Sequence, residues 1–206
     1  MKYLFLATLL FINNLFNPIM ATEEPDFKLI SEDGEFQIRE YDPKIIAQVE
    51  VEGDFDEASS KGFKLLADYI FGNNLLDGES QKISMTTPVE MSPLADNLSM
   101  TSPIMDDQVN KTWSINFVMP KEYSLNNLPK PNNSQVSIIE VPAEKYVVIV
   151  FSGLVRESSY AEKAELLSNY LQEKNYKHHG AIKIARYNPP WTLPFFRRNE
   201  LMVKID

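Results

Sequence analysis

The sequence predicts an α+β fold in which a large antiparallel sheet is covered by two helices. Three observations lead to this prediction: two segments have helical periodicity, eight short segments have the composition of strands, and the order ββαββ occurs twice. Several strand segments alternate apolar with polar residues, which is typical of antiparallel strands with one buried face. The chain is therefore expected to form one domain built from two similar halves.

The two helices are predicted from their start and stop signals. They cover residues 55–71 and 159–176, and each carries an apolar stripe at helical spacing. Each begins with a capping residue followed three positions later by an acidic residue, and each ends before a glycine that can adopt the left-handed conformation. These residues are Asp54, Glu57 and Gly72 for the first helix, and Ser159, Glu162 and Gly180 for the second.

The eight strand segments are short and rich in β-branched and aromatic residues. They lie four before and four after residue 120, so each half supplies four strands and one helix. The predicted strands are residues 35–41, 45–51, 82–89, 113–119, 136–141, 146–151, 181–187 and 200–205.

An internal repeat is visible when the segments of about 35–119 and 136–205 are aligned at a shift of 100 or 101 residues. A tandem duplication explains the matches, and it predicts a pseudo-two-fold barrel or cupped sheet with a central cleft. A coincidental likeness between two amphipathic helices is the alternative. The matches are Gly53 with Gly153, 64–70 with 165–171, Lys82-Ile83 with Lys183-Ile184, and Pro88 with Pro189.

Residues 1–21 have the pattern of a secretory signal peptide. A lysine precedes a mostly apolar run that is short for a membrane span, and Ala21 offers a small residue for cleavage. We expect residues 22–206 to be exported to the periplasm or the extracellular space, without a stable membrane anchor. Retention as an uncleaved anchor is the alternative. The absence of cysteine excludes disulfides and attachment as a bacterial lipoprotein.

Charge and composition argue against several classes of function. The formal net charge of −9 and the lack of a basic cluster beyond Arg197-Arg198 argue against a nucleic-acid partner, because phosphate neutralisation dominates such binding. The adjacent pair His178 and His179 contains the only histidines. We interpret it as a cap near the end of the second helix, with a metal-ligand role as the alternative. Neither catalytic residues nor a metal site is predicted, and the chain is not expected to be an enzyme.

Residues 186–200, RYNPPWTLPFFRRNE, stand out because three prolines exclude regular hydrogen bonding in a segment rich in aromatic and basic residues. The segment is predicted to be a loop. One interpretation is that its rings cover a flat apolar ligand and its arginines hold a carboxylate. The other is that the loop packs on its own domain and the arginines pair with acidic residues. The side chains concerned are Trp191, Phe195, Phe196, Arg197 and Arg198.

Methionines gather in the middle third of the chain. Packing in the core is the favoured role for any one of them, and lining a pocket for a flat ligand is the alternative. They are Met85, Met91, Met100, Met105 and Met119.

Five segments together resemble the SOUL haem-binding family over nearly the whole mature chain. The resemblance implies a distorted eight-stranded antiparallel barrel with two flanking helices, built from a duplicated unit. It also implies non-covalent binding of b-type haem or a related tetrapyrrole, here by an exported carrier or buffer. A non-haem ligand-binding or protein-interaction module on the same fold is the alternative. The segments are IREYDP (38–43), KISMTTPVEM (82–91), FVMPKEY (117–123), VSIIEVPAEKYVVIVFSG (136–153) and RYNPPWTLPFFRRNEL (186–201).

The resemblance also implies where the ligand binds. In members that lack a strong axial ligand the site lies beside the first helix, on the stretch matched by 60–67. Ser60 stands where those members have a cationic residue, and Glu40 stands where some are thought to use a histidine. The resemblance therefore implies that this chain lacks that imidazole ligand for the iron. The expected haem-binding residues are Ser60, Phe63, Lys64, Ala67, Met85, Trp191, Phe195, Phe196, Arg197 and Arg198.

Overall fold

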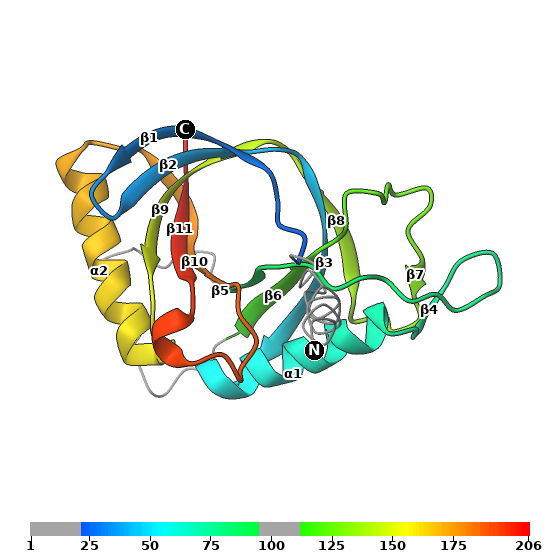
Figure 1. The fold of residues 1–206 in the computed structure, drawn as a ribbon. Coiled ribbons are helices and arrows are strands. Elements are labelled where there is room, and N and C mark those ends of the chain that lie inside the picture. The colour runs from blue at the N-terminus through cyan, green and yellow to red at the C-terminus, as the bar shows by residue number, and fades with distance from the viewer. Residues whose placement is uncertain (1–21, 95–111) are drawn as a thin grey trace, which may run out of the picture.

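The computed structural model describes residues 22–94 and 112–206 of the chain. Its main feature is an open antiparallel sheet of nine strands in the order β1-β2-β9-β11-β10-β5-β6-β3-β8 (Figure 1). Two short strands, β4 and β7, pair separately. The elements are β1 (Phe27–Asp33), β2 (Phe36–Tyr41), β3 (Lys44–Glu52), α1 (Phe55–Ile70), β4 (Asn74–Leu75), β5 (Val89–Pro93), β6 (Thr112–Val118), β7 (Lys130–Pro131), β8 (Ser137–Val141), β9 (Glu144–Phe151), α2 (Glu157–Glu173), β10 (His178–Arg186), the 3₁₀ helix η1 (Pro194–Phe196) and β11 (Asn199–Ile205).

The predicted mixed fold with a large antiparallel sheet and two helices is confirmed. The closed eight-stranded barrel is not found: the sheet has nine strands, and β1 and β8 form its two free edges among the described residues. The sheet is strongly curled, and both helices lie on its outer side (Figure 1). The predicted signal segment, Met100 and Met105 lie outside the described residues.

Within the nine-stranded sheet, two strand assignments differ from the sequence prediction. β1 was missed, although Asp33-Gly34 is a hairpin signal and Gly34 has the positive φ of 62° that such a turn requires. The predicted strand 82–89 contributes only Val89 to β5. Before it, Ile83 donates its backbone N–H to the carbonyl of Ile70, at the end of α1, and Pro88 has no N–H for a sheet ladder.

The first helix forms as its sequence signals predict. The Asp54 side chain accepts the backbone N–H of Glu57 at 2.8 Å and caps the helix. Gly62 packs against β6 so closely that a Cβ added there would lie 2.6 Å from Cγ1 of Ile115. The small residue therefore lets α1 approach the sheet.

The second helix begins and ends earlier than predicted. Its N-cap is Arg156, whose backbone N–H donates to Ser159 Oγ at 2.8 Å, so Ser159 lies inside the first turn. The helix ends at Glu173, and Gly180 occupies an irregularity within β10. His178 and His179 belong to β10, so their predicted role as a helix cap is wrong.

When β1, β4, β7 and η1 are left out, the two halves of the chain have the same order of elements, β2-β3-α1-β5-β6 and β8-β9-α2-β10-β11. In the large sheet, the three strands β3-β6-β5 lie beside the three strands β10-β11-β9. The two groups join where β5 pairs with β10, with Met91 opposite Ile184. The predicted match of Lys82-Ile83 with Lys183-Ile184 is not the structural register, because residues 71–88 separate α1 from β5 whereas only 174–177 separate α2 from β10. An origin by duplication stays a prediction.

Each face of the sheet has its own core. Both helices pack on the outer face, where the main apolar cluster includes Trp113, Ile115, Leu167 and Leu201. On the opposite face, Tyr41, Tyr146, Val148 and Met202 form a small cluster beside buried charges. No helix among the described residues is long and apolar enough to cross a membrane.

Candidate functional site

The residues predicted on the first helix lie on one exposed flank of α1. Phe63 is 39% exposed, and its ring contacts that of Phe117 in β6 edge-on, with centroids 5.4 Å apart. Ser60 and Lys64 are exposed and Ala67 is half-buried. This flank presents an apolar ring bordered by polar and cationic side chains, and the close packing of α1 on β6 positions it.

A row of paired strand residues connects this flank to the proline-rich loop. Phe117 of β6 lies opposite Val89 of β5, and Val89 lies opposite Arg186, the last residue of β10. Met85, a predicted ligand contact, is exposed in the segment before Val89, whereas Met91 and Met119 are buried in the core. The loop begins directly after Arg186, so the two groups of predicted residues flank this row.

Arg186 is the residue of this surface that the sequence prediction missed. Its Nη1 donates to Ser59 Oγ of α1 at 2.8 Å, and its Cζ lies 5.0 Å from the centre of the Phe55 ring. Its Nε and Nη2 atoms are buried and have no hydrogen-bond partner. Burial lowers the pKa of Arg186 from its ordinary value. Only its position as the first arginine of the loop segment marked it in the sequence.

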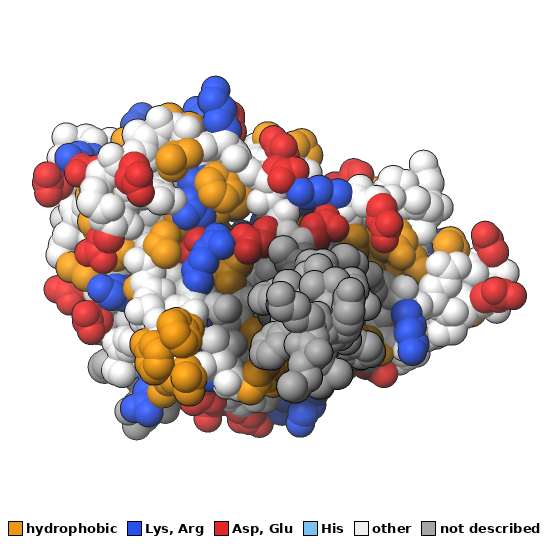
Figure 2. Space-filling model, in the orientation of Figure 1, with side chains coloured by type: hydrophobic (Ala, Val, Ile, Leu, Met, Phe, Trp, Pro, Cys, Tyr) orange, Lys and Arg blue, Asp and Glu red, His pale blue; other side chains and the backbone are white. Residues whose placement is uncertain are grey.

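The loop after β10 exposes its aromatic side chains. Trp191 is 82% exposed, and Phe195 and Phe196 on η1 are 65% and 70% exposed, with their rings 4.5 Å apart. Figure 2 shows the resulting hydrophobic group at the lower left, over η1. A hydrogen bond from the Gly153 N–H to the carbonyl of Pro194 ties η1 to the segment that precedes α2. The rings are therefore presented on an anchored loop and are not packed into the domain.

Arg197 acts within the loop. Its Nε donates to the carbonyl of Thr192 at 2.8 Å, and its Nη2 donates to the carbonyl of Pro190. These two bonds satisfy backbone acceptors that the prolines leave without regular partners. The guanidinium thus stabilises the loop conformation, a role that neither interpretation drawn from the sequence included.

Arg198 points to the opposite side and joins a buried ionic cluster. It pairs with Glu200 at 2.9 Å and with Glu24 at 3.0 Å, and its Cζ lies 3.7 Å from the Tyr187 ring centre. Glu200 is fully buried and also pairs with Arg39 at 2.9 Å. The expectation of a free cationic rim formed by Arg197 and Arg198 is therefore not what the geometry shows.

A second buried ionic cluster lies on the same inner face of the sheet. Glu90 is fully buried and pairs with Lys44 at 2.5 Å and with Lys183 at 3.3 Å. Burial opposes ionisation, but the two ammonium groups outweigh it and lower the pKa of Glu90 from 4.5 to about 2. The carboxylate is therefore ionised at neutral pH.

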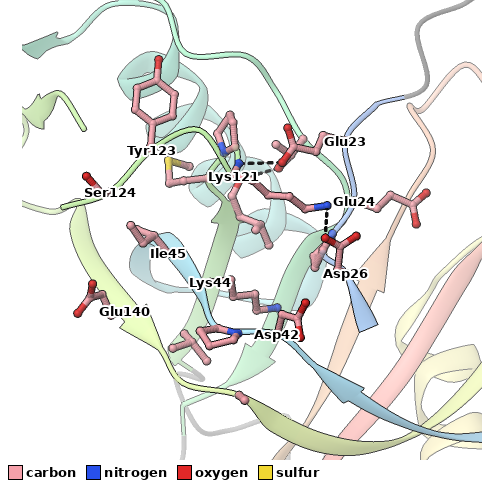
Figure 3. Close-up of a pocket in the computed structure, with 18 of the residues that line it drawn as sticks. Glu23, Glu24, Asp26, Asp42, Lys44, Ile45, Lys121, Tyr123, Ser124 and Glu140 are labelled. Atoms are coloured by element: carbon pink, nitrogen blue, oxygen red, sulfur yellow. Dashed lines mark hydrogen bonds and ion pairs between the residues drawn. The ribbon is translucent and has the colours of Figure 1, made fainter. Parts of the chain in front are cut away.

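A cavity of about 850 Å³ has no α1 residue in its wall, and Glu24 in this wall is the partner of Arg198. It is formed by the N-terminal segment 23–26, the turns after β2 and β8, and residues 118–124 (Figure 3). Lys121 pairs with Asp26 at 2.7 Å, and its backbone N–H donates to Glu23. Five carboxylates and two lysines line the cavity: Glu23, Glu24, Asp26, Asp42, Glu140, Lys44 and Lys121. No local sequence pattern predicts this cavity, because distant segments form its wall.

No imidazole lies near the α1 flank among the described residues. His178 and His179 begin β10 and Arg186 ends it, which places them about 25 Å apart along the strand. His179 contacts Asp206. Glu40 shares the outer face with Phe36 and Ile38, and Phe36 stacks on Tyr170 of α2. Glu40 is thus on the α2 side. Residues 22–94 and 112–206 hold no group of three or more His, Cys, Asp or Glu side chains suited to a metal ion.

Solved structures share the fold at low sequence identity. The C-terminal domain of EcmrR matches with a TM-score of 0.61 and 10% identity, covering 83% of this chain and 96% of that one. An uncharacterized conserved protein from Listeria innocua matches with a TM-score of 0.55 and 12% identity, covering 91% and 94%. A hydrolase from Listeria innocua matches at 0.53 and 11%, covering 86% and 94%. These likenesses show the fold alone.

Sequence comparisons identify the family. No curated protein sequence matches the chain. The family model described as SOUL heme-binding protein matches residues 22–204, which is nearly the whole described domain. This match includes α1, the row ending at Arg186 and the proline-rich loop. The chain belongs to the SOUL heme-binding protein family.

Proposed function

We propose that the protein binds haem or a related tetrapyrrole non-covalently on the surface between α1 and the proline-rich loop. The observation that carries this proposal is the set of exposed apolar side chains on both sides of the Arg186 row, in a chain of a heme-binding family. Flat rings bind well to exposed aromatic side chains because each covers a large apolar area. The side chains are Phe63, Met85, Trp191, Phe195 and Phe196.

The residues present fit the porphyrin ring better than they fit its iron. Aromatic and thioether side chains contact an apolar macrocycle favourably. Imidazole is the usual strong protein ligand of haem iron, and the two described histidines lie at the far end of β10. Binding through the ring and its edge substituents therefore gives a weak, reversible complex, which suits a carrier or buffer. We place this activity outside the cytoplasm on the basis of residues 1–21.

Titration of the purified protein with haem and with metal-free protoporphyrin tests the proposal. We expect saturable binding of both. Phe63→Ser should weaken it about tenfold, because a partly exposed aromatic contact contributes on the order of 1.5 kcal/mol when covered. Phe71→Ser is the matched control, because Phe71 is an exposed phenylalanine just after α1 and away from the row. No saturable binding, or equal loss in both variants, would refute the proposal.

A non-haem ligand in the cavity of Figure 3 is the second candidate function. Because carboxylates outnumber lysines on its wall, the cavity favours an organic cation. Glu140 lines the cavity, is exposed and forms no ion pair with another described residue, so Glu140→Gln should weaken binding of such a cation without altering porphyrin binding. Loss of porphyrin binding in Glu140→Gln would instead place the tetrapyrrole in this cavity.

A further inference from the structure

Arg186 is largely enclosed although its hydrogen bonding is incomplete. Nη1 donates to Ser59 Oγ, whereas Nε and Nη2 are buried without a partner. They are the only such side-chain nitrogen or oxygen atoms in the described part of the chain. A buried donor without an acceptor is destabilising, and more so when it belongs to a charged group.

The protein pairs its other buried cations with carboxylates. Arg39 bonds Glu200 at 2.9 Å, and Lys183 bonds Glu90 at 3.3 Å. Asp56 acts on Arg186 electrostatically but accepts no hydrogen bond from Nε or Nη2. The fold thus supplies a carboxylate partner to the other buried cations but not to the Nε and Nη2 edge of Arg186.

The unsatisfied edge has the geometry of a carboxylate fork. Nε–H and one Nη–H of arginine point in parallel from the same edge, and together they match the two oxygens of a carboxylate. Ser59 holds the third nitrogen, and the Phe55 ring lies 5.0 Å from Cζ. Because both contacts fix the guanidinium before a ligand arrives, binding costs little ordering of this side chain.

Apolar side chains lie on both sides of the unsatisfied edge of Arg186. Val89, opposite Arg186 in β5, separates it from Phe117 and the overlying Phe63. On the other side the chain continues directly into the loop that carries Trp191. An acid group at Arg186 would leave its apolar body free to contact these rings.

We propose that Arg186 is the carboxylate anchor of this surface, and that the ligand is a flat apolar molecule bearing an acid group. The inference rests on the proposed function and narrows the class of ligand. An anchor at Arg186 requires a carboxylate on the ligand, whereas the ring contacts alone do not. Nε and Nη2 are covered in the structure, so the carboxylate reaches them only when a covering side chain shifts. Arg197 lies near enough for its charge to act on Arg186, so the proline-rich loop is close to this edge.

Two probes that differ in one group test the anchor. Pyrene-1-butyrate and pyrene-1-butanol share a flat apolar body, and only the first has a carboxylate. We expect the wild type to bind the acid at least about tenfold more tightly, as a charge-assisted pair requires. Arg186→Gln should reduce this preference to less than twofold. Lys61→Gln, which removes an exposed cation from the same helix, should keep it. No preference in the wild type, or an unchanged preference in Arg186→Gln, overturns the proposal.

Protoporphyrin separates this inference from the proposed function. Porphyrin binding that is equal in the wild type and Arg186→Gln supports the function and overturns the anchor. An Arg186-dependent preference for pyrenebutyrate without any porphyrin binding supports the anchor and overturns the function.

Thermal unfolding distinguishes an anchor from a structural arginine. Arg186→Gln should melt at or above the wild-type temperature, because it removes a buried charge whose Nε and Nη2 have no acceptor. If Asp56 turned to pair with Arg186 in solution, Asp56→Asn and Arg186→Gln would each lower the melting temperature and the double variant would lower it no further. That result would overturn the proposal.

Discussion

Glu90→Gln tests whether the buried cluster on the inner face holds the sheet together. The substitution keeps the side-chain size but removes the charge that Lys44 and Lys183 share. Because Glu90 is 1% exposed, both ammonium groups would lose their main partner in an environment with little water. Breaking a buried pair by removing one member costs about 3–5 kcal/mol. For a domain of this size, that corresponds to a fall in melting temperature of about 6–20 °C.

The pKa of Glu90 gives an independent magnitude and a pH window. Its depression from 4.5 to about 2 corresponds to roughly 3 kcal/mol. Because the pKa is lower in the folded state, this stabilisation is fully present above about pH 4.5 and is lost as the pH falls toward 2. Glutamine does not titrate. The difference in stability between wild type and variant should therefore stay nearly constant from pH 7 to 5 and shrink below pH 4.5, by about 1 kcal/mol at pH 3.5.

Urea unfolding of both proteins at pH 7, 5 and 3.5 measures this difference. Glu57→Gln is the control, because its pair with Lys61 is exposed and should contribute less than about 1 kcal/mol at any pH. The reasoning would be refuted by a loss below 1 kcal/mol at pH 7 in Glu90→Gln, or by a difference that does not change between pH 5 and 3.5.

Four further predictions follow from the site and from the N-terminal segment. Haem and metal-free protoporphyrin should bind within about tenfold of each other in paired titrations, and a six-coordinate imidazole-type Soret band would contradict this. Glu40→His should leave the haem spectrum unchanged, because position 40 lies on the α2 side; a new imidazole band would show otherwise. Arg198→Ala should lower the free energy of unfolding measured in urea by about 1.5–3 kcal/mol, because buried Glu200 loses one of its partners. The loss should exceed that in Arg197→Ala, and a larger loss in Arg197→Ala would contradict the prediction. Intact-mass measurement of protein from the producing cell should show a chain that starts at Thr22, and a soluble form starting at Met1 would refute export.

Local sequence signals predicted the elements that local interactions form. Asp54 caps α1 because its side chain reaches an N–H only three residues away. The alternation of apolar and polar residues in 45–51 and 200–205 predicted β3 and β11. This signal is also local, because successive residues of a strand point to opposite faces of the sheet. The same logic failed at 82–89, where the apolar pattern is strand-like but the chain first packs against the end of α1. It also missed β1, which is held mainly by pairing with β2.

The candidate site was predicted in part. The aromatic residues of the loop and Phe63 are exposed as a ligand surface requires. Arg197 and Arg198 are neighbours in the chain and looked equivalent, yet one bonds the loop backbone and the other a buried glutamate. Arg186 was overlooked because an arginine in a sequence carries no sign of whether a carboxylate will face it.

The sequence by itself determined the family, the helices, most strands and the exposed proline-rich loop, because each depends on residues close together in the chain. The tertiary structure alone decided whether the sheet closed, which charges were paired, and where a cavity formed. These outcomes depend on contacts between distant segments, such as Glu90 with Lys183 and Arg186 with Ser59. A charged side chain in a folded protein can pair only with a group that the topology brings near it, and no local sequence pattern identifies that group.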